Sequence, residues 1–167
     1  MNDAPDDLVF VALGGLGEIG MNAALYGYGP PRKRKWLMVD LGVAFANLDL
    51  PGVDLIMPDL SFIEKMRKDI VGLVITHAHE DHIGAVADLW PRLRCPVYAT
   101  PFAAGMLELK RLGEPGAPKI PIKVVRYGER LELGPFDVEY VPMAHSIPES
   151  SALAIRTPAG LVFHTGD

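Results

Sequence analysis

The sequence predicts a layered α/β fold with a mixed sheet, and three of its features support this prediction. Residues 71–112 alternate between apolar strand patterns and segments of helical pattern. From residue 120 onward the pattern changes to short strands separated by turns. The chain of 167 residues is 49% hydrophobic, and this length corresponds to one domain whose core needs no disulfide. Strands interleaved with surface helices in this way are typical of layered α/β proteins.

The first elements are expected to be strands. The apolar run at residues 8–13 is closed by glycines and predicts a buried strand, after which residues 14–20 form a loop. Residues 21–28 and 36–39 are apolar and flank a basic turn, so we expect them to pair as a hairpin. Residues 40–60 are rich in Gly, Asp and Pro and are expected to be irregular.

The rest of the chain alternates helix and strand and then continues as strands. Residues 61–68 can cap and form a short helix with Phe62, Ile63 and Met66 on one face. Residues 71–75 are fully apolar and predict a buried strand. The remaining elements are expected, in chain order, as a helix at 82–90, a strand at 96–99, a helix at 101–112, and strands at 122–125, 130–133, 136–141, 151–156 and 161–164.

The composition excludes several classes of protein. The 16 basic and 21 acidic residues give a net charge of −5, which excludes broad electrostatic binding of nucleic acid by this segment alone. A phosphate partner must therefore be bound locally, by a metal or a small patch. The single cysteine, Cys95, cannot form an internal disulfide and is expected to be a small buried residue, which favours a reducing compartment. The acidic start MNDAPDD does not resemble a signal peptide, and no apolar stretch approaches 18 residues, so we expect a cytoplasmic protein without a membrane partner.

A glycine-rich loop matches the dinucleotide-binding fingerprint G-x-G-x-x-G. Gly15 to Gly20 reads GLGEIG after a predicted strand, and Asp40 stands 20 residues further on, at the end of the next strand. The fingerprint requires a helix whose N-terminus faces the pyrophosphate, but residues 21–35 contain two glycines and two prolines and leave too little room for one. We therefore expect no dinucleotide partner, and we expect the glycines to let the loop turn tightly beside another group.

The strongest signal is the segment HAHEDH, which follows the apolar strand at 71–75 and contains three of the five histidines. As the chain leaves the strand in extended form, His77 and His79 point the same way because side chains alternate along a strand. Asp81 and His82 lie at the turn into the next helix and can offer ligands to a second metal ion. A solvated histidine-rich loop is the alternative, but it does not explain the position between a buried strand and a helix. The segment therefore predicts a metal site.

Two later strand ends supply further candidate ligands. His145 begins the loop HSIPESS after a strand. Alone it would be a structural histidine, but the histidine pair at 77 and 79 makes it the leading candidate for a third ligand. Asp167 follows a glycine just after the last strand, and its two carboxylate oxygens could bridge two metals. His164 lies at an odd offset from Asp167, on the opposite face of an extended strand, and is expected to pack or form a hydrogen bond.

Three other polar sites have competing interpretations. Asp40 ends a strand, where it could orient a ligating histidine or the backbone of the site, and the alternative is a turn-forming Asp before Gly42. Glu80 alternates away from the histidine pair and is expected to face solvent. The basic residues 32–35 could contact phosphate, but a basic hairpin turn is usually a solvated tip.

Taken together, these motifs resemble those of the metallo-β-lactamase superfamily. H-x-H-x-D-H follows a buried strand, with an Asp at an earlier strand end, a later lone His and a still later strand-end Asp. Within the superfamily, the sequence most resembles the bacterial ribonuclease J family of the β-CASP group. The stretches that carry this resemblance are ALGGLGEIGMN at 12–22, residues 39–59 with GVD and PD, THAHEDHIGA at 76–85, AHSIPES at 144–150 and HTGD at 164–167.

The resemblance implies a fold, a cofactor and a set of ligands. The fold would be an αββα sandwich with mixed sheets, of which this chain would be the first half. The cofactor would be zinc, with two ions per complete site and manganese as an alternative. The implied metal ligands are His77, His79 and His145 for one ion and Asp81 and His82 for the other, with Asp167 bridging them and Asp40 in support. The catalytic carboxylates would be Asp81, Asp167 and Asp40.

The chain departs from the family in its length. It stops at Asp167, where the family continues with the rest of the first domain, a β-CASP domain that helps bind RNA, and a region that supplies a further His ligand and dimer contacts. We therefore expect residues 1–167 to be a partial metallo-β-lactamase domain, with the β-CASP and C-terminal parts absent. The full-length protein is expected to be a homo-oligomer.

The resulting hypothesis is a metal-dependent ribonuclease, with RNA as partner, that acts in RNA decay and processing by 5′ exonucleolytic and endonucleolytic phosphodiester hydrolysis. A hydroxide bridging two metals roughly 3.5 to 4 Å apart would attack the phosphorus in line. The isolated chain is expected to be poorly active. Two alternatives stay open, namely a small-molecule metallohydrolase of the same fold that acts on a thioester or lactone, and an inactive structural fragment.

Overall fold

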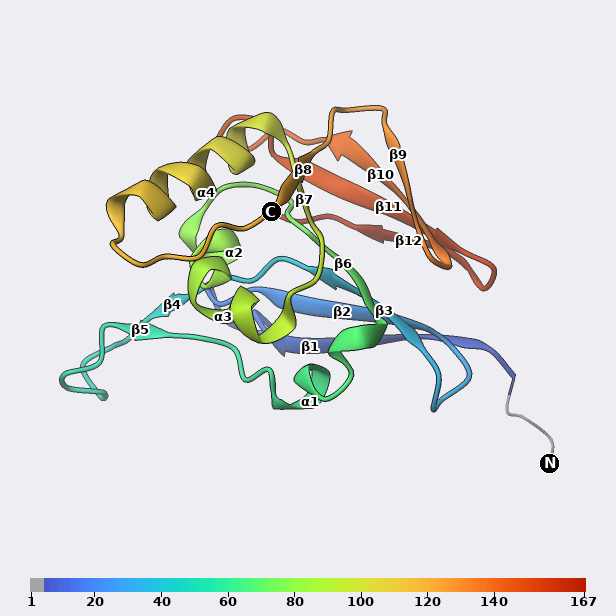
Figure 1. Ribbon diagram of the computed structural model, residues 1–167, viewed down its shortest axis with the longest axis horizontal. Helices are drawn as coiled ribbons and strands as arrows, with labels where there is room; N and C mark the ends of the chain where they lie inside the picture. Colours follow the sequence, from blue (N-terminus) through green and yellow to red (C-terminus); the bar gives the residue numbers. More distant parts are fainter. Residues whose placement is uncertain (1–4) are drawn as a thin grey trace.

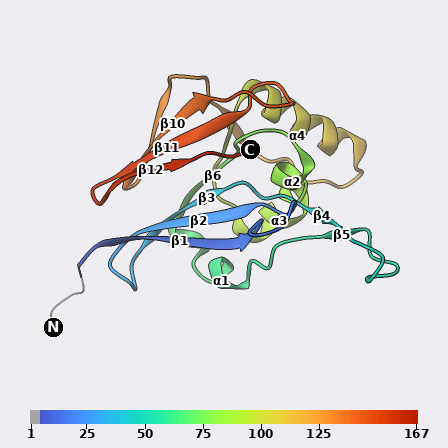
Figure 2. The same ribbon diagram turned by 180° about the vertical axis from the view of Figure 1, so that it is seen from behind.

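Two β-sheets lie face to face, and helices cover the outer side of the first sheet (Figure 1). The structure is a computed structural model and describes residues 5–167. The view from behind shows no helix on the outer side of the second sheet in the described part of the chain (Figure 2). The predicted layered α/β fold with mixed sheets is therefore confirmed, and the described residues supply three layers of an αββα arrangement.

The first sheet is mixed. Its strands are β1 (Asp7–Gly14), β2 (Ala23–Gly29), β3 (Lys35–Val39), β6 (Ile70–Val74), β7 (Val97–Ala99) and β8 (Ile122–Val124), and they lie in the order β1-β2-β3-β6-β7-β8. The first three pair antiparallel, including the predicted hairpin of β2 and β3, and β3, β6, β7 and β8 pair parallel. The glycine-rich loop is thus followed by a strand, where a dinucleotide site would need a helix.

The second sheet is antiparallel throughout. Its strands are β9 (Arg130–Leu133), β10 (Phe136–Pro142), β11 (Ser151–Thr157) and β12 (Gly160–His164), in the order β12-β11-β10-β9. A small ribbon of β4 (Ala44–Phe45) and β5 (Leu55–Ile56) lies within the segment that was expected to be irregular. Strands of two residues are too short for side-chain alternation to predict them.

Two helices differ from the expectation. Residues 61–68 form only α1 (Ser61–Glu64), followed by the 3-10 turn η1 (Arg67–Asp69). The helix expected at 82–90 is divided into α2 (Glu80–Ile83) and α3 (Val86–Leu93). The division arises because the carbonyl of Asp81 accepts a hydrogen bond from the backbone N–H of Asn22, while the N–H of Ala85 donates to Leu41. These contacts with distant segments replace the hydrogen bond from Ala85 N to the Asp81 carbonyl that a continuous helix would need.

The last helix, α4 (Pro101–Gly113), agrees with the prediction to within one residue. It begins with proline at its first turn, and the Thr100 side chain accepts a hydrogen bond from the N–H of Ala103. None of the described helices is both long and apolar enough to cross a bilayer.

Side-chain alternation in the first sheet divides the core into two clusters. Leu25, Met38 and Leu73 point to the outer face and pack with apolar residues of α1, α3 and α4. Their neighbours Leu37 and Val74 point the other way and pack against the second sheet. Both faces of β3 and β6 are therefore buried, which explains why these strands are continuously apolar in sequence.

Candidate metal centre

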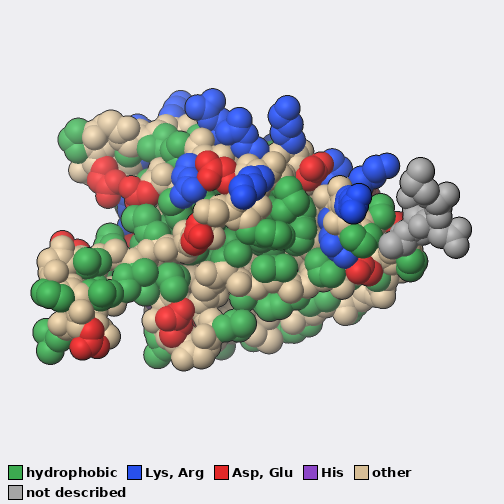
Figure 3. Space-filling view, turned by 90° about the horizontal axis from the view of Figure 1, so that it is seen from below, with side chains coloured by type: hydrophobic (Ala, Val, Ile, Leu, Met, Phe, Trp, Pro, Cys, Tyr) green, Lys and Arg blue, Asp and Glu red, His purple; other side chains and the backbone are tan. Residues whose placement is uncertain are grey.

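The histidine-rich segment lies where β6 leaves the first sheet and the chain turns into α2. Two loops of the second sheet reach the same place, one between β10 and β11 that carries His145 and one after β12 that carries Asp167. On the face of the described chain seen from below, hydrophobic side chains are interspersed with charged ones and no histidine is visible (Figure 3). The histidine side chains thus do not show on that face.

Three imidazoles form the first donor group. His79 Nδ1 lies 3.1 Å from His77 Nε2 and 3.2 Å from His145 Nε2. Ligand atoms of the three residues all lie within 4.8 Å of one another. Burial lowers the pKa of His77 to about 4, and the neighbouring charge of His82 acts in the same direction, so His77 is neutral at pH 7. Imidazole nitrogens that converge in this way form a donor set suited to a divalent metal ion.

A second donor group lies beside the first and shares His77. It comprises His77, His82 and Asp167, again with ligand atoms within 4.8 Å of one another. The Asp167 carboxylate lies between the groups, because its Oδ1 is 3.3 Å from His82 Nε2 and its Oδ2 is 3.9 Å from His145 Nε2. Asp81 Oδ2 lies 3.5 Å from His82 Nε2, on the side of the second group. The structure thus brings all six sequence-predicted ligands together.

Asp40 lies behind His82 and contacts this member of the second donor group directly. Its Oδ2 is 2.7 Å from His82 Nδ1, and its two oxygens accept hydrogen bonds from the backbone N–H and the hydroxyl of Thr76. Asp40 is 1% exposed. The Asp40 carboxylate thus lies where it can orient His82, a residue 42 positions away in the chain.

Asp40 and His82 form an ion pair as well as a hydrogen bond. Burial acts to raise the pKa of Asp40, but the charge of His82 and the hydrogen bonds from His82 and Thr76 outweigh it and lower that pKa. Burial acts to lower the pKa of His82, but the charge and hydrogen bond of Asp40 outweigh it and raise that pKa to about 9. With Nδ1 facing Asp40, Nε2 of His82 faces the second donor group.

Backbone contacts among three segments hold the Asp81 and His82 side chains in place. The carbonyl of Asp81 accepts from Asn22 N, and the carbonyl of His82 accepts from Leu41 N. Gly42 makes this close approach possible, because a Cβ added there would lie 1.7 Å from the Asp81 carbonyl oxygen. The Asp-Leu-Gly sequence after β3 therefore serves the site through its backbone as well as through Asp40.

Asn22 is a residue of the site that sequence reasoning missed. Its Nδ2 lies 3.2 Å from Asp81 Oδ2 and 3.1 Å from His82 Nε2. A Cβ at Gly15 would lie 2.4 Å from Asn22 Oδ1, so the glycine-rich loop leaves room for this amide. The sequence marked Asn22 only as the end of a resembling stretch, and an isolated amide after a loop carries no pattern that would assign it a role.

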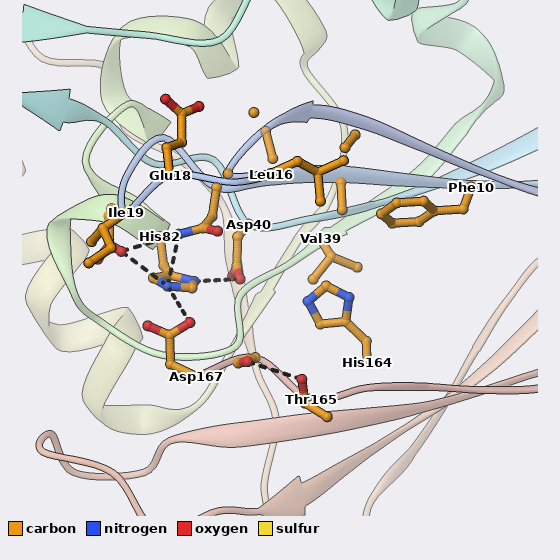
Figure 4. A pocket seen from close by; sticks show the side chains of 18 of the residues that line it. Phe10, Leu16, Glu18, Ile19, Val39, Asp40, His82, His164, Thr165 and Asp167 are labelled. Atoms are coloured by element: carbon orange, nitrogen blue, oxygen red, sulfur yellow. Dashed lines mark hydrogen bonds and ion pairs between the residues drawn. The ribbon is translucent and has the colours of Figure 1, made fainter.

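A pocket of about 460 Å³ opens beside the second donor group. Figure 4 shows His82, Asp40 and Asp167 at one end of it, with Phe10 and His164 further along. His164 Nδ1 is 2.9 Å from the hydroxyl of Tyr26, so this histidine forms a hydrogen bond, as expected, and lies outside both donor groups.

The remaining sequence expectations concern residues outside the donor groups. The Glu80 carboxylate is 46% exposed and pairs with Lys110 at 2.6 Å. Cys95 is buried, which raises the pKa of its thiol to about 11. In the basic turn, Arg34 pairs with Asp7 and Lys35 with Asp69, and Arg32 and Lys33 are exposed. None of these residues reaches the donor groups.

The sequence of this chain is similar to those of known proteins. The family model of the metallo-beta-lactamase superfamily matches residues 22–167. The chain is 57% identical over 162 residues to a protein named Ribonuclease J from Sinorhizobium meliloti, covering 97% of this chain and 29% of that protein. It is 41% identical over 157 residues to Ribonuclease J from Helicobacter pylori, covering 93% of this chain and 22% of that protein. The chain thus spans less than a third of the length of these curated relatives.

A solved structure shares the fold. The metallo-beta-lactamase fold protein YhfI from Bacillus subtilis superimposes with a TM-score of 0.64 at 16% sequence identity, covering 98% of this chain and 63% of that chain. At this level of identity the similarity concerns the fold alone. Because the family model spans the donor residues from His77 to Asp167 and the fold agrees, the chain belongs to the metallo-beta-lactamase superfamily.

Proposed function

We propose that this chain is the metal-binding part of a ribonuclease that hydrolyses RNA phosphodiester bonds by 5′ exonucleolytic and endonucleolytic cleavage. The observation that carries the proposal is the pair of donor groups with Asp167 between them, in a chain 57% identical to a relative named Ribonuclease J. The proposal places the protein in the cytoplasm, in RNA decay and processing. It takes residues 1–167 as the first part of a metallo-β-lactamase domain in a longer, homo-oligomeric protein with a β-CASP domain.

The donor set fits two divalent metal ions. His77, His79 and His145 would hold one ion, Asp81 and His82 the other, and Asp167 would contact both. Imidazole and carboxylate ligands suit zinc, and manganese is the alternative. When bound, such a pair supplies Lewis-acid polarisation of a phosphate and lowers the pKa of water at the site. It also supplies local positive charge, which a segment of net charge −5 needs in order to hold a polyanion.

The residues of the chain keep these donors in position. Asp40 accepts from His82 Nδ1 and so orients the ring with Nε2 turned toward the second donor group. The Asn22 amide donates to Asp81 Oδ2 and so restrains that carboxylate. The pocket beside Asp81, His82 and Asp167 gives a substrate access to this group. Preorganised donors of this kind cost little rearrangement during the reaction.

The test is a chimera, because the chain alone is expected to be poorly active. The matching 162-residue segment of the Sinorhizobium meliloti Ribonuclease J is replaced by this chain, and hydrolysis of a 5′-labelled RNA is measured with added zinc or manganese. We expect hydrolysis by the chimera, and loss of both zinc content and hydrolysis in the double variant His77→Ala/His79→Ala. Glu80→Gln is the matched control, since its carboxylate lies in the same segment but pairs with Lys110, and it should retain both.

Three outcomes would contradict the proposal. A folded, zinc-loaded chimera that does not cleave RNA would exclude the ribonuclease function, and thioester or lactone hydrolysis by the same protein would favour the small-molecule alternative. Unchanged zinc content in the double histidine variant would exclude the assigned ligands. A folded chimera that binds no metal would favour the structural alternative.

A further inference from the structure

Several contacts anchor the loop that carries His145, and Ile147 within it packs against the core on the outer face of the first sheet. The loop is closed by a backbone hydrogen bond from Met143 N to the carbonyl of Ser150, and Ser151 N donates to the carbonyl of Thr76 at the end of β6. The hydroxyl of Tyr127 also donates to the Ser150 carbonyl. Residues 142–146 between these anchors are exposed. His145 therefore projects from an exposed stretch of a loop, whereas His77 and His79 follow a buried strand.

Glu149 links this loop to a different element. Its Oε2 accepts a hydrogen bond of 2.6 Å from the backbone N–H of Phe102, in the first turn of α4. That N–H has no partner within the helix, and a carboxylate is favoured at this end of a helix. The contact joins two segments 47 residues apart. The helix α4 follows β7, and β7 pairs with β6. The Glu149 contact with α4 therefore connects the His145 loop to the sheet from which His77 and His79 extend.

The backbone of Glu149 is strained. Its φ is 58°, in the left-handed region that residues other than glycine seldom adopt. Such strain persists only where surrounding contacts impose it, and it is concentrated near functional sites. The conformation is the one that places the Glu149 carboxylate on α4 while Ser150 and Ser151 continue into β11. A glycine would adopt this φ more readily but would lack the carboxylate.

We propose that Glu149 is a positioning residue for the first donor group, since its contact with α4 holds the loop so that His145 Nε2 meets His77 and His79. This inference rests on the metal centre proposed above, but not on the nature of the substrate. It assigns a role to a carboxylate that lies in neither donor group. A residue that orients a ligand in this way typically changes metal affinity by about 10- to 100-fold when it is removed.

The experiment measures zinc affinity of the full chain by competition with a chromophoric chelator, alongside thermal unfolding. Glu149→Ala should weaken zinc binding at one site by about tenfold or more. Glu149→Gln keeps an acceptor oxygen for the Phe102 N–H and should stay within about threefold of the wild type. Thr100→Val is the matched control, because the Thr100 hydroxyl accepts from Ala103 N in the same turn of α4, whereas Glu149 accepts from Phe102 N. This variant should lower the melting temperature without weakening zinc binding.

A double-mutant cycle with His145→Ala separates positioning from a general effect on the fold. If Glu149 acts through His145, Glu149→Ala should cause no further loss of zinc affinity once His145 has been removed. Equal zinc affinities of the wild type and Glu149→Ala, or an undiminished effect in the His145→Ala background, would overturn the inference. A wild-type chain that binds no zinc would overturn the metal centre together with it, whereas failure to cleave RNA would leave these affinities, and the inference, unaffected.

Discussion

The substitution Gly42→Ala tests whether backbone packing holds the second donor group in place. A Cβ at position 42 would lie 1.7 Å from the Asp81 carbonyl oxygen and 2.6 Å from His82 N. Ordinary contact requires more than 3.4 Å, so the residue 81–82 backbone, or the strand end at residues 40–43, would have to move well over an ångström. Functional groups tolerate displacements of only about 0.5 Å before a site loses its geometry.

The energetic cost follows from the hydrogen bonds at this contact. Three of the backbone bonds that join the segments involve residues 80–82 as acceptors, from Asn22 N to Asp81 O at 2.9 Å, from Leu41 N to His82 O at 2.8 Å and from Val43 N to Glu80 O at 3.1 Å. At about 1 kcal/mol each, their loss would lower the free energy of unfolding by about 3 kcal/mol. Overpacking adds a further penalty of about 1 to 3 kcal/mol. The sum is a large part of the stability of a typical domain, which is about 5 to 15 kcal/mol.

Urea unfolding and metal analysis check this prediction, with Gly105→Ala as the control. Gly105 is exposed inside α4 and a Cβ there would meet nothing within 4 Å, so alanine should raise the free energy of unfolding by about 0.5 to 1 kcal/mol. Gly42→Ala should instead unfold at much lower urea and, where folded, bind less than the wild-type amount of zinc. A Gly42→Ala protein with wild-type stability and zinc content would show that this contact does not hold the site together.

Three further predictions follow from the site and its surroundings. In the metal-free protein, folding raises the pKa of His82 from 6.5 to about 9. The stability that protonated His82 contributes, about 3 kcal/mol, should therefore be complete below about pH 6.5 and be lost as the pH rises through about 9. Asp40→Asn should abolish most of this dependence, and urea unfolding across pH 6 to about 10 measures it, with an unchanged pH profile contradicting the ion pair. Tyr26→Phe should lower the free energy of unfolding by about 1 kcal/mol, since His164 Nδ1 loses its partner, and an unaltered urea midpoint would argue against that bond. Calorimetric titration with NAD or NADP should give no micromolar binding, because β2 follows the glycine-rich loop, and tight binding of either would restore the dinucleotide interpretation.

Local patterns in the sequence were sufficient to predict most strands and to single out the residues that meet in the two donor groups. The alternation that turns His77 and His79 the same way is a property of the extended chain, and their rings do meet in the structure. Asp167 was expected to face two metals, and its two oxygens do point toward different donor groups. The first expectation depends on residues two positions apart, where backbone geometry fixes the relation between side chains, whereas Asp167 was singled out as a carboxylate after a glycine at a strand end.

The features that were missed depend on contacts between distant segments. The break between α2 and α3 and the role of Asn22 both arise where residues 20–22, 40–43 and 80–85 exchange backbone hydrogen bonds. Asp40 remained ambiguous in sequence for the same reason, since only the fold shows that its carboxylate meets His82. Periodicity along one strand or helix contains no information about such pairings.

The donor groups draw on both sheets, because His77 to His82 leave the first sheet whereas His145 and Asp167 belong to loops of the second. Ions bound there would act as cross-links across the sandwich, close to the apolar layer that holds the sheets together. A ligand that binds only the native arrangement stabilises it in proportion to the logarithm of the ligand concentration. A higher concentration of free metal would therefore lower the fraction of molecules in which the two sheets separate. Resistance to proteolysis would then report on metal availability, even when no substrate is present.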